Sequence, residues 1–381
     1  MAGGQSPVES VVSTAFNNFY AGKRVLVTGH TGFKGGWLSL WLSKLGAKVG
    51  GISLEAPTNP NFYETISPGV FAGEQECDIR DLKALTLGIK QMKPDIIFHM
   101  AAQSLVRRSF ANPVETFGTN ALGTAHLLEA VRCNELSCPV IVITTDKCYE
   151  NQGWEHGYRE TDPLGGHDVY SMSKAAAELV VQSWRKSFFL PDPKLGNLAS
   201  VRAGNVIGGG DYAGDRIVPD CIRALQAGQP SPVRNPSATR PWQHVLDCLS
   251  GYLWLGACLT GAEKQTPLAS AFNFGPGADS NLPVRELVDE ILKIWPGRWQ
   301  QISEPNAPHE AAKLNLDISK AAELLQWFPV WSFKEAIQET IVWYHERHVK
   351  KNPDMLNFSL AQIDAFTTFA AARQIQWAQP A

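Results

Sequence analysis

The sequence predicts an α/β protein: a doubly wound parallel sheet followed by a smaller C-terminal α/β domain. The first observation is a series of short apolar runs, such as VIVITT at 140–145, whose apolar residues are consecutive rather than alternating. Such runs are typical of strands buried on both faces of a parallel sheet. The second is that helical patterns separate these runs, which indicates repeated β–α–β units. The third is a glycine motif where the first run meets the first helix.

Length and composition indicate a soluble globular protein with a large core, because the chain has 381 residues, 44% of them hydrophobic and 19% charged. A net charge of −3 excludes a strong field that would hold nucleic acid or an anionic membrane. Seven scattered cysteines without a CxxC pair indicate reduced thiols, and we expect neither a disulfide framework nor a metal site. The N-terminal MAGGQSPVES lacks the features of a signal peptide, so we expect a cytoplasmic protein.

Each expected element follows from its own run of residues. Strands are expected at 24–28, 48–53, 74–78, 95–100, 140–145, 199–203 and 271–274. Helices are expected at 34–45, 81–91, 113–133, 170–189, 216–227, 245–262 and 284–295. Beyond about residue 204 the alternation weakens and stretches rich in Gly and Pro take over. We therefore expect an N-terminal arm at 1–22, a sheet domain at 23–203 and mainly a second domain at 204–381, with some later segments returning to the sheet.

The glycine motif GHTGFKG follows the first strand and opens the first helix, with Gly29, Gly32 and Gly35 in a GxxGxxG spacing. Glycines there allow a sharp turn, a close approach of pyrophosphate to the backbone, and tight packing of helix on strand. The start of the helix adds N–H groups and the positive end of its dipole. The sequence thus predicts a Rossmann-type dinucleotide site in the 23–203 domain. Lys34, inside the turn, either approaches the pyrophosphate or is solvated at the loop tip.

The choice of dinucleotide is predicted at the end of the second strand, where an acid favours a free ribose hydroxyl and an arginine favours a 2′-phosphate. Glu55 lies about twenty residues beyond Gly35, and no arginine precedes Arg80 after that strand. This favours NAD, although Glu55 is equally explained as a solvated turn residue. Ser53 is a possible ribose contact.

Tyr170 and Lys174 stand four residues apart at the start of a predicted helix, so that both side chains lie on one face. An ammonium beside a phenol favours the phenolate and lowers the pKa of the tyrosine. Alcohol oxidation by NAD requires such a base, which removes the hydroxyl proton while hydride leaves the same carbon. The pair therefore predicts a catalytic Tyr–Lys site.

The core strand VIVITT ends in Thr145, Asp146 and Lys147, at the sheet edge where ligands bind in open α/β folds. A hydroxyl at Thr145 completes a Thr–Tyr–Lys arrangement around one substrate oxygen. Asp146 adds an acid that plain alcohol oxidation does not need, and its alternative role is that of a loop cap.

Five strings carry a family resemblance: TGHTGFKGGWL, HMAAQSLVRRSF, TTDKCYEN, VRAGNVIGGGDYAGDRIVPD and RNPSATRPWQHV. They resemble the extended short-chain dehydrogenase/reductase family of nucleotide-sugar enzymes, and more narrowly its CDP-glucose 4,6-dehydratase branch, over roughly residues 20–350. The resemblance implies conversion of CDP-D-glucose to CDP-4-keto-6-deoxy-D-glucose, the first committed step toward the dideoxysugars of bacterial lipopolysaccharide O-antigens.

The mechanism that the resemblance implies uses the residues named above. Tyr170, supported by Lys174 and Thr145, takes the 4-OH proton while the C4 hydride passes to NAD. A base then removes the C5 proton as Asp146 protonates the departing C6 hydroxyl. The hydride returns to C6, so that no external reductant is needed.

One departure concerns Lys147, because related dTDP-glucose dehydratases carry glutamate at this position as the C5 base. A lysine acts as a base only if its pKa is lowered by burial or neighbouring cations. It otherwise stabilises the enolate formed at C5. Acid, base and stabiliser all remain open for Lys147, and we predict only that it is catalytic.

The binding residues follow from the motifs and the resemblance together. For NAD, they are Gly29, Thr31, Gly32, Phe33, Lys34, Gly35, Ser53, Asp78, Ile79, Ala101, Ala102, Tyr170 and Lys174. For the nucleotide sugar, they are Gln103, Arg108, Asn205, Arg216, Arg240 and His244, with Arg107 as an alternative to Arg108. Surface salt bridges are the alternative for Arg108 and Arg216, and His99 is expected to be a core residue. Helices 113–133 and 170–189 resemble those of a four-helix homodimer interface, and pairing of dimers into a tetramer stays open.

Two other functions remain possible from the sequence. A nucleotide-sugar 4-epimerase needs Tyr170 and Lys174 but neither Asp146 nor Lys147. A non-catalytic NAD-binding sensor shares the scaffold, but it has no need for an activated phenol.

Overall fold

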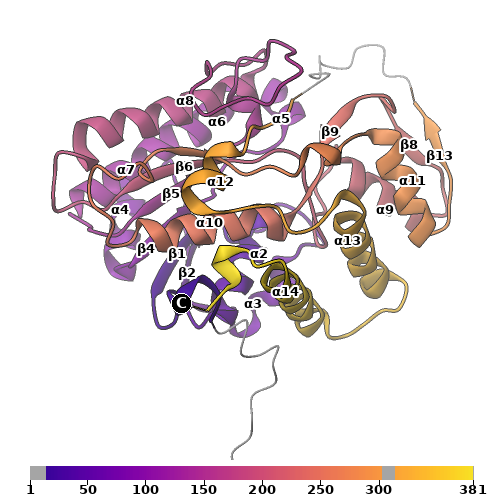
Figure 1. Ribbon diagram of the computed structural model, residues 1–381, viewed down its shortest axis with the longest axis horizontal. Coiled ribbons are helices and arrows are strands. Elements are labelled where there is room, and N and C mark those ends of the chain that lie inside the picture. The colour runs from indigo at the N-terminus through magenta and orange to yellow at the C-terminus, as the bar shows by residue number, and fades with distance from the viewer. Residues whose placement is uncertain (1–13, 303–313, 381) are drawn as a thin grey trace, which may run out of the picture.

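The main sheet has seven parallel strands in the order β11-β6-β5-β4-β1-β2-β3 in the computed structural model, which describes residues 14–302 and 314–380 (Figure 1). The strands are β1 (Arg24–Thr28), β2 (Lys48–Ser53), β3 (Phe71–Glu76), β4 (Ile96–His99), β5 (Val140–Ile143), β6 (Leu198–Arg202) and β11 (Ala271–Asn273). All seven predicted strands are therefore confirmed, as is the doubly wound α/β fold. The strand order reverses between β1 and β4, and ligands bind at such a switch point beyond the carboxyl ends of the strands.

Helices cover both faces of this sheet, and each face has its own hydrophobic cluster. One face carries α4 (Leu82–Met92), α7 (Gly123–Cys133) and α8 (Val169–Trp184), which pack against one another. The other carries α2 (Phe33–Lys44) and α10 (Val245–Leu259). The helix predicted at 113–133 is divided into α6 (Pro113–Phe117), the π-helical turn η2 (Gly118–Leu122) and α7.

The smaller part of the molecule lies to one side of the sheet, at the right of Figure 1. It contains three two-stranded pairings, β7–β10, β9–β12 and β8–β13. Its strands and helices are β7 (Val206–Ile207), α9 (Ile217–Gln226), β8 (Ser231–Val233), β9 (Thr239–Pro241), β10 (Gln243–His244), β12 (Asn281–Pro283), α11 (Val284–Ile294) and β13 (Trp299–Gln301). Two later segments, α10 and β11, return to the main sheet.

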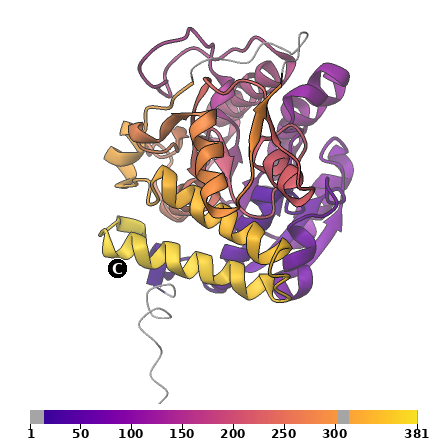
Figure 2. The same cartoon turned by 90° about the vertical axis from the view of Figure 1, so that its right-hand side faces the viewer.

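Five α-helices were not predicted: α3 (Tyr63–Val70), α5 (Val106–Ala111), α12 (Ser319–Leu325), α13 (Phe333–His348) and α14 (Met355–Ala372). The short helical turns are η1 (Ala15–Asn18), η3 (Asp146–Cys148), η4 (Arg185–Phe189), η5 (Ala278–Ser280) and η6 (Gln376–Ala378). Figure 2 shows α13 and α14 lying across the lower side of the molecule.

Helix α2 is enclosed on all sides, because residues 35–42 are all buried. Helices α3, α10 and α14 contact it in addition to the sheet. Its Trp41 packs edge-on against Phe366 of α14 and against Trp377 of η6. Trp377 stacks in turn on Phe16 of η1, at 4.9 Å between ring centroids. The C-terminal segment thus covers the helix that follows the glycine turn.

The predicted N-terminal arm is described only in part, because residues 1–13 lie outside the described residues. From residue 14 the chain forms η1 and buries Ala15, Phe16 and Tyr20, so that this part packs into the core. In the ranges 14–302 and 314–380, no helix is long and apolar enough to cross a membrane.

Candidate active site

A cavity of about 760 Å³ opens at the carboxyl ends of the parallel strands. Its walls come from the glycine turn, from the ends of β2, β4 and β5, from the start of α8, and from the 203–242 segment. The volume is typical of sites for small molecules and cofactors. All thirteen residues predicted for NAD line it: Gly29, Thr31, Gly32, Phe33, Lys34, Gly35, Ser53, Asp78, Ile79, Ala101, Ala102, Tyr170 and Lys174.

The glycine turn has the close packing that a dinucleotide cradle requires. Gly29 has φ +75°, and a Cβ there would lie 2.7 Å from the backbone nitrogen of Ala101. A Cβ on Gly35 would overlap the carbonyl oxygen of Gly29. Helix α2 begins directly after Gly32, with its N–H groups at the cavity. The residues present therefore fit a dinucleotide pyrophosphate.

The adenosine side of the cavity also fits a cofactor without a 2′-phosphate. Ser53 and Thr31 join their hydroxyls at 2.7 Å, and Glu55 lines the same wall. Arg80 is engaged by the Asp78 carboxylate through several short hydrogen bonds, and this arginine lowers the pKa of Asp78. The nearest cation that would suit a 2′-phosphate is thus already paired with an acid.

Lys34 is not solvated at a loop tip, so that alternative is wrong. Its Nζ donates a hydrogen bond of 3.0 Å to the Tyr252 hydroxyl and lies 5.1 Å from the centroid of that ring. Burial lowers the pKa of Lys34. The contact with α10 holds the ammonium inside the cavity wall.

Tyr170 enters the cavity from the first turn of α8, which Asp168 caps by accepting from the Ser171 N–H at 2.9 Å. Burial raises the pKa of Tyr170 to about 12, although a hydrogen bond with Thr145 and the charge of Arg216 act in the opposite direction. Desolvation outweighs the charge of Arg216, so Tyr170 does not show in this structure the lowered pKa that the sequence predicted. Lys174 is also buried, and burial followed by the charge of Lys34 lowers its pKa to about 8.

Thr145, Asp146 and Lys147 form the corner after β5. The Thr145 hydroxyl accepts from the Lys147 N–H at 3.3 Å and so caps the η3 turn, the role that was left open for Asp146. Thr145 also lies 3.0 Å from Asp146 Oδ1. Asp146 is 0% exposed, behind the lining residues Thr145 and Lys147, and its Oδ2 has no hydrogen-bond partner. Lys147 is one-third exposed, with Nζ 3.7 Å from Asp146 Oδ1.

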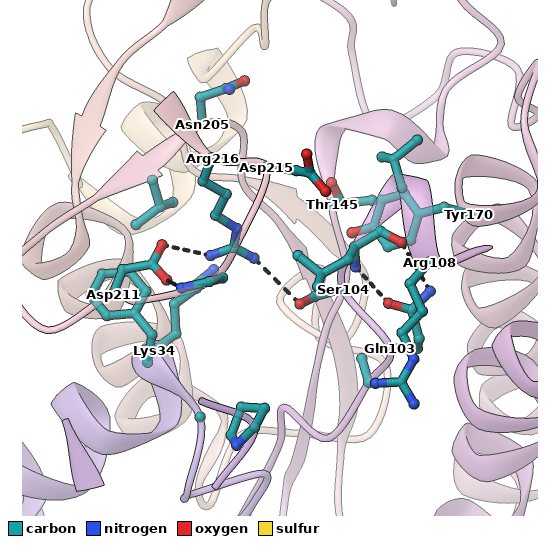
Figure 3. A pocket seen from close by; sticks show the side chains of 18 of the residues that line it. Lys34, Gln103, Ser104, Arg108, Thr145, Tyr170, Asn205, Asp211, Asp215 and Arg216 are labelled. Atoms are coloured by element: carbon teal, nitrogen blue, oxygen red, sulfur yellow. Dashed lines mark hydrogen bonds and ion pairs between the residues drawn. The ribbon is translucent and has the colours of Figure 1, made fainter. Parts of the chain in front are cut away.

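Arg216 crosses the cavity from the smaller part toward the sheet. It donates to Asp211 at 2.8 Å and to Ser104 at 3.3 Å, and Figure 3 shows it between Lys34 on one side and Thr145 on the other. It is thus a cavity residue held by an ion pair with Asp211. Asp211 is buried, whereas the Arg216 side chain is 34% exposed and lines the cavity.

The other residues predicted for the sugar nucleotide differ in their surroundings. Arg108 lies at the rim and pairs with Glu115 at 2.9 Å, half exposed, as its salt-bridge alternative predicted. Gln103 lines the wall, but its amide bonds Leu105 and Thr116. Asn205 and Arg240 line the cavity, and Asn205 Oδ1 is buried without a hydrogen-bond partner.

His244 is not placed to touch a ligand, so its prediction as a substrate residue is wrong. It is 0% exposed, packs edge-on against Trp37 and Trp331, and accepts from the Leu246 N–H at the start of α10. The sequence placed it beside Arg240, but the strand β10 turns its side chain into the core. His99 is a core residue as expected, bonded to Thr28 at 2.8 Å.

The structure adds residues that the sequence did not single out. Asn120, in the π-helical turn η2, bonds both Gln103 and Ser173 and so ties α8 to the cavity wall. A π-turn inside a helix is frequent at functional sites, and the flanking glycines of GTNALG were the available signal. No motif or spacing in the sequence singles out Asp211 or Ser104, the partners of Arg216. Over the described part of the chain, no group of three His, Cys, Asp or Glu side chains is placed to hold a metal ion.

Comparison with known proteins places this site in context. Residues 26–264 match the family model described as GDP-mannose 4,6 dehydratase. The chain is 46% identical over 354 residues to a CDP-glucose 4,6-dehydratase of Salmonella typhimurium, which covers 92% of this chain and 97% of that protein. It is 27% identical to a dTDP-glucose 4,6-dehydratase of Xanthomonas campestris, over 84% of this chain and 92% of that protein.

Among solved structures, the dTDP-glucose 4,6-dehydratase DesIV of Streptomyces venezuelae, with NAD and TYD bound, superposes with a TM-score of 0.72. That match has 24% identity and covers 86% of this chain and 99% of the other. At this identity it shows the shared fold.

Proposed function

The chain belongs to the GDP-mannose 4,6-dehydratase family, and on that premise we propose that it converts CDP-D-glucose into CDP-4-keto-6-deoxy-D-glucose with NAD. The observation that carries the proposal is the position of Asp146 and Lys147 directly beside the oxidation residues Thr145 and Tyr170. Oxidation at C4 alone needs no such acid and cation. Elimination of water across C5 and C6 needs both a proton donor and a group that handles the C5 proton or its charge.

Oxidation is the first task of these residues. Tyr170 takes the proton of the sugar 4-OH, and Thr145 hydrogen-bonds the same oxygen. Lys174 supports the phenolate by its charge, which its pKa of about 8 keeps largely in place at neutral pH. Bound NAD supplies the acceptor for the C4 hydride and the donor that returns it to C6.

Elimination is the second task, once C4 is a ketone and C5–H is acidified. Asp146 protonates the departing C6 hydroxyl, and Oδ2, which lacks a protein partner, is the oxygen available for it. Lys147 either removes the C5 proton or stabilises the enolate. Its partial exposure and its 3.7 Å distance from Asp146 suit either role.

The nucleotide is held by cations on the smaller part of the molecule. Arg216 and Arg240 bind the diphosphate, and Asn205 donates to a phosphate oxygen. Arg216 would exchange its contact with Ser104 for the diphosphate. The preference for cytosine rests on the 46% identity with the Salmonella typhimurium protein.

The active form is a homodimer built on α6 and α8. The outer surface of these neighbouring helices carries exposed apolar side chains, namely Val114, Phe117, Met172 and Leu179, with Val114 84% exposed. Exposed apolar clusters of this kind mark protein interfaces. Leu179→Glu should yield monomers in light scattering, whereas Leu87→Glu on α4, at a similarly exposed leucine, should not. A wild-type monomer would contradict the dimer.

The function is tested by incubating the protein with CDP-, dTDP-, UDP- and GDP-glucose, with NAD and NADP compared. We expect loss of one water from CDP-glucose in the presence of NAD, detected by mass spectrometry. Tyr170→Phe should abolish product formation while cofactor binding is retained. Simple inversion at C4 would indicate a 4-epimerase instead, and cofactor binding without turnover of any sugar nucleotide would indicate a sensor.

A further inference from the structure

Gly204 lies directly against the carboxylate of Asp146. It stands two residues beyond the end of β6 and lines the cavity, while Asp146 lies behind the wall with 0% exposure. A Cβ at Gly204 would lie 2.8 Å from Asp146 Oδ2 and 3.4 Å from Cγ of Pro241. The first distance is shorter than the roughly 3.3 Å of close contacts between carbon and oxygen. The cavity wall beside Oδ2 is thus formed at residue 204 by backbone alone.

The backbone conformation does not explain this glycine. The φ angle of Gly204 lies outside the left-handed region, so residues with a side chain adopt it without strain. The chain is also fixed on both sides of Gly204. The carbonyl of Ala203 accepts from the Asp146 N–H at 3.1 Å, and the carbonyl of Asn205 accepts from the Gln243 N–H at 3.2 Å. What the glycine provides is therefore space beside the Asp146 carboxylate.

The two oxygens of Asp146 have different surroundings. Oδ1 accepts a hydrogen bond of 3.0 Å from the Thr145 hydroxyl and lies 3.7 Å from Lys147 Nζ. Oδ2, the oxygen against Gly204, is buried and has no hydrogen-bond partner among the residues that the structure describes. A buried polar atom without a partner is costly, and in a native protein it calls for a ligand or a catalytic role. Oδ2 is therefore the oxygen that exchanges a proton with the substrate.

We propose that Gly204 is a positioning residue for the acid step, because its missing side chain lets the substrate C6 oxygen come within hydrogen-bond distance of Asp146 Oδ2. This inference rests on the proposed dehydration and deepens it. In the step, the Oδ2–H bond breaks and an O–H bond forms on the departing oxygen. The C6–O bond breaks and its electron pair stays on that oxygen, while the pair left at C5 after deprotonation forms the C5–C6 double bond. The products are water and an unsaturated 4-ketone.

Alanine at residue 204 should displace the acid and leave the fold intact. The backbone there is held by two hydrogen-bonded carbonyls, whereas Oδ2 is the far end of a side chain with rotatable bonds. The added methyl group is therefore accommodated by rotation of the Asp146 carboxylate. A displacement of about 1 Å at a reacting group costs about 10²-fold in rate.

The test separates the need for an acid from the other demands of the reaction. CDP-6-deoxy-6-fluoroglucose undergoes the same C4 oxidation and C5 deprotonation, but fluoride leaves C6 with its electron pair and without a proton. Single-turnover rates of product formation are compared for this substrate and CDP-glucose in the wild type, Gly204→Ala and Asp146→Asn. Gly208→Ala is the matched control. Gly208 lines the same cavity, and a Cβ there would also lie 2.8 Å from a neighbour, but the neighbour is the apolar Cγ1 of Val245.

Gly204→Ala should lose about 10²-fold with CDP-glucose and far less with the fluoro substrate, and Asp146→Asn should show the same difference. Reduced nicotinamide should accumulate in Gly204→Ala with CDP-glucose, measured by its absorbance, because oxidation proceeds while elimination is delayed. The double variant should lose little more than Asp146→Asn alone, since both changes act on one carboxyl. Gly208→Ala should affect the two substrates alike.

Equal slowing of both substrates in Gly204→Ala would overturn the positioning role, as would a double variant whose losses multiply. The same selective loss in Gly208→Ala would trace the effect to the segment and not to the space beside Oδ2. An unfolded Gly204→Ala, detected by thermal unfolding, would show that the backbone yields instead of the carboxylate, and would also overturn the role. Equal losses for both substrates in Asp146→Asn would remove Asp146 as the acid and Gly204 with it. Failure of the wild type to dehydrate CDP-glucose would instead overturn the proposed function, so the two failures are distinguishable.

Discussion

Glu178 and Arg202 form an ion pair directly beneath the catalytic corner, and we expect Glu178→Gln to destabilise the protein strongly. Each side chain is only 3% exposed, and Arg202 donates from both Nε and an Nη nitrogen at 3.0 Å. Thr144 and Ser200 donate to the same carboxylate at 2.5 and 2.7 Å, which ties β5 and β6 to α8. Gln at 178 keeps the shape but leaves the Arg202 charge buried without a counter-charge.

The size of the effect follows from this burial. Removing one partner of a buried ion pair costs about 3–5 kcal/mol. The entropy of unfolding is about 2.1 cal/mol/K per residue, or about 0.8 kcal/mol/K for 381 residues. The melting temperature should therefore fall by about 4–6 °C. Burial alone would raise the pKa of Glu178, but Arg202 and the hydroxyl donors lower it, so this stabilisation is present at neutral pH and is lost as the pH falls below the usual carboxyl range.

The assay is thermal unfolding at pH 7, with Asp95→Asn as the matched control. Asp95 also pairs with an arginine, Arg24, at 2.7 Å, but the two side chains are 34% and 49% exposed. Solvent screens an exposed pair of this kind, so the control should lose about 1 °C or less. Equal melting temperatures for the two variants would refute the reasoning from burial.

Three further outcomes are expected. Lys147→Met should slow dehydration by about 10²-fold or more, measured as product formation, and unaltered turnover would remove Lys147 from the mechanism. Burial raises the pKa of Asp247 to about 7, so its folded-state pKa exceeds the unfolded value and stability is lost as the pH rises through about 7. The melting temperature of Asp247→Asn minus that of the wild type should therefore be larger at pH 8.5 than at pH 5. The same difference at both pH values would contradict this. Lys34→Met removes a charge that lowers the pKa of Lys174. The alkaline limb of the pH–activity profile should therefore move to higher pH by as much as about one unit. An unchanged alkaline limb would show that the Lys34 charge does not affect Lys174.

The main sheet was predictable because each strand is specified locally. Runs such as VIVI at 140–143 are buried on both faces of the sheet, and their consecutive apolar residues predict this burial without any tertiary information. The glycine turn was predictable for the same reason, since its three glycines act within seven residues. The helices α13 and α14 were missed although Ser332 and Glu335 form a capping box. Their own patterning is weak because each helix packs against more than one neighbour: α13 contacts α11 and α14, and α14 also contacts α2 and α3.

The contents of the cavity were predictable only where the residues are close in sequence. Thr145, Asp146 and Lys147 are adjacent, and Tyr170 and Lys174 share one face of α8. The partner of Lys34 is 218 positions away in Tyr252, and no local spacing leads to it. The same holds for His244, whose inward direction is decided by the pairing of β10 with β7.

The covering of α2 by the C-terminal segment has a consequence for synthesis on the ribosome. Phe16 and Trp41 reach their partner Trp377 only after the intervening residues 42–376 have been translated. Until then the apolar outer surface of the helix that presents the glycine turn is uncovered, in a nascent chain whose sheet residues have already emerged. Contacts this distant in sequence form late and slow folding. The helix that opens the nucleotide cradle is therefore covered only late in folding, although its own residues are among the earlier ones of this chain.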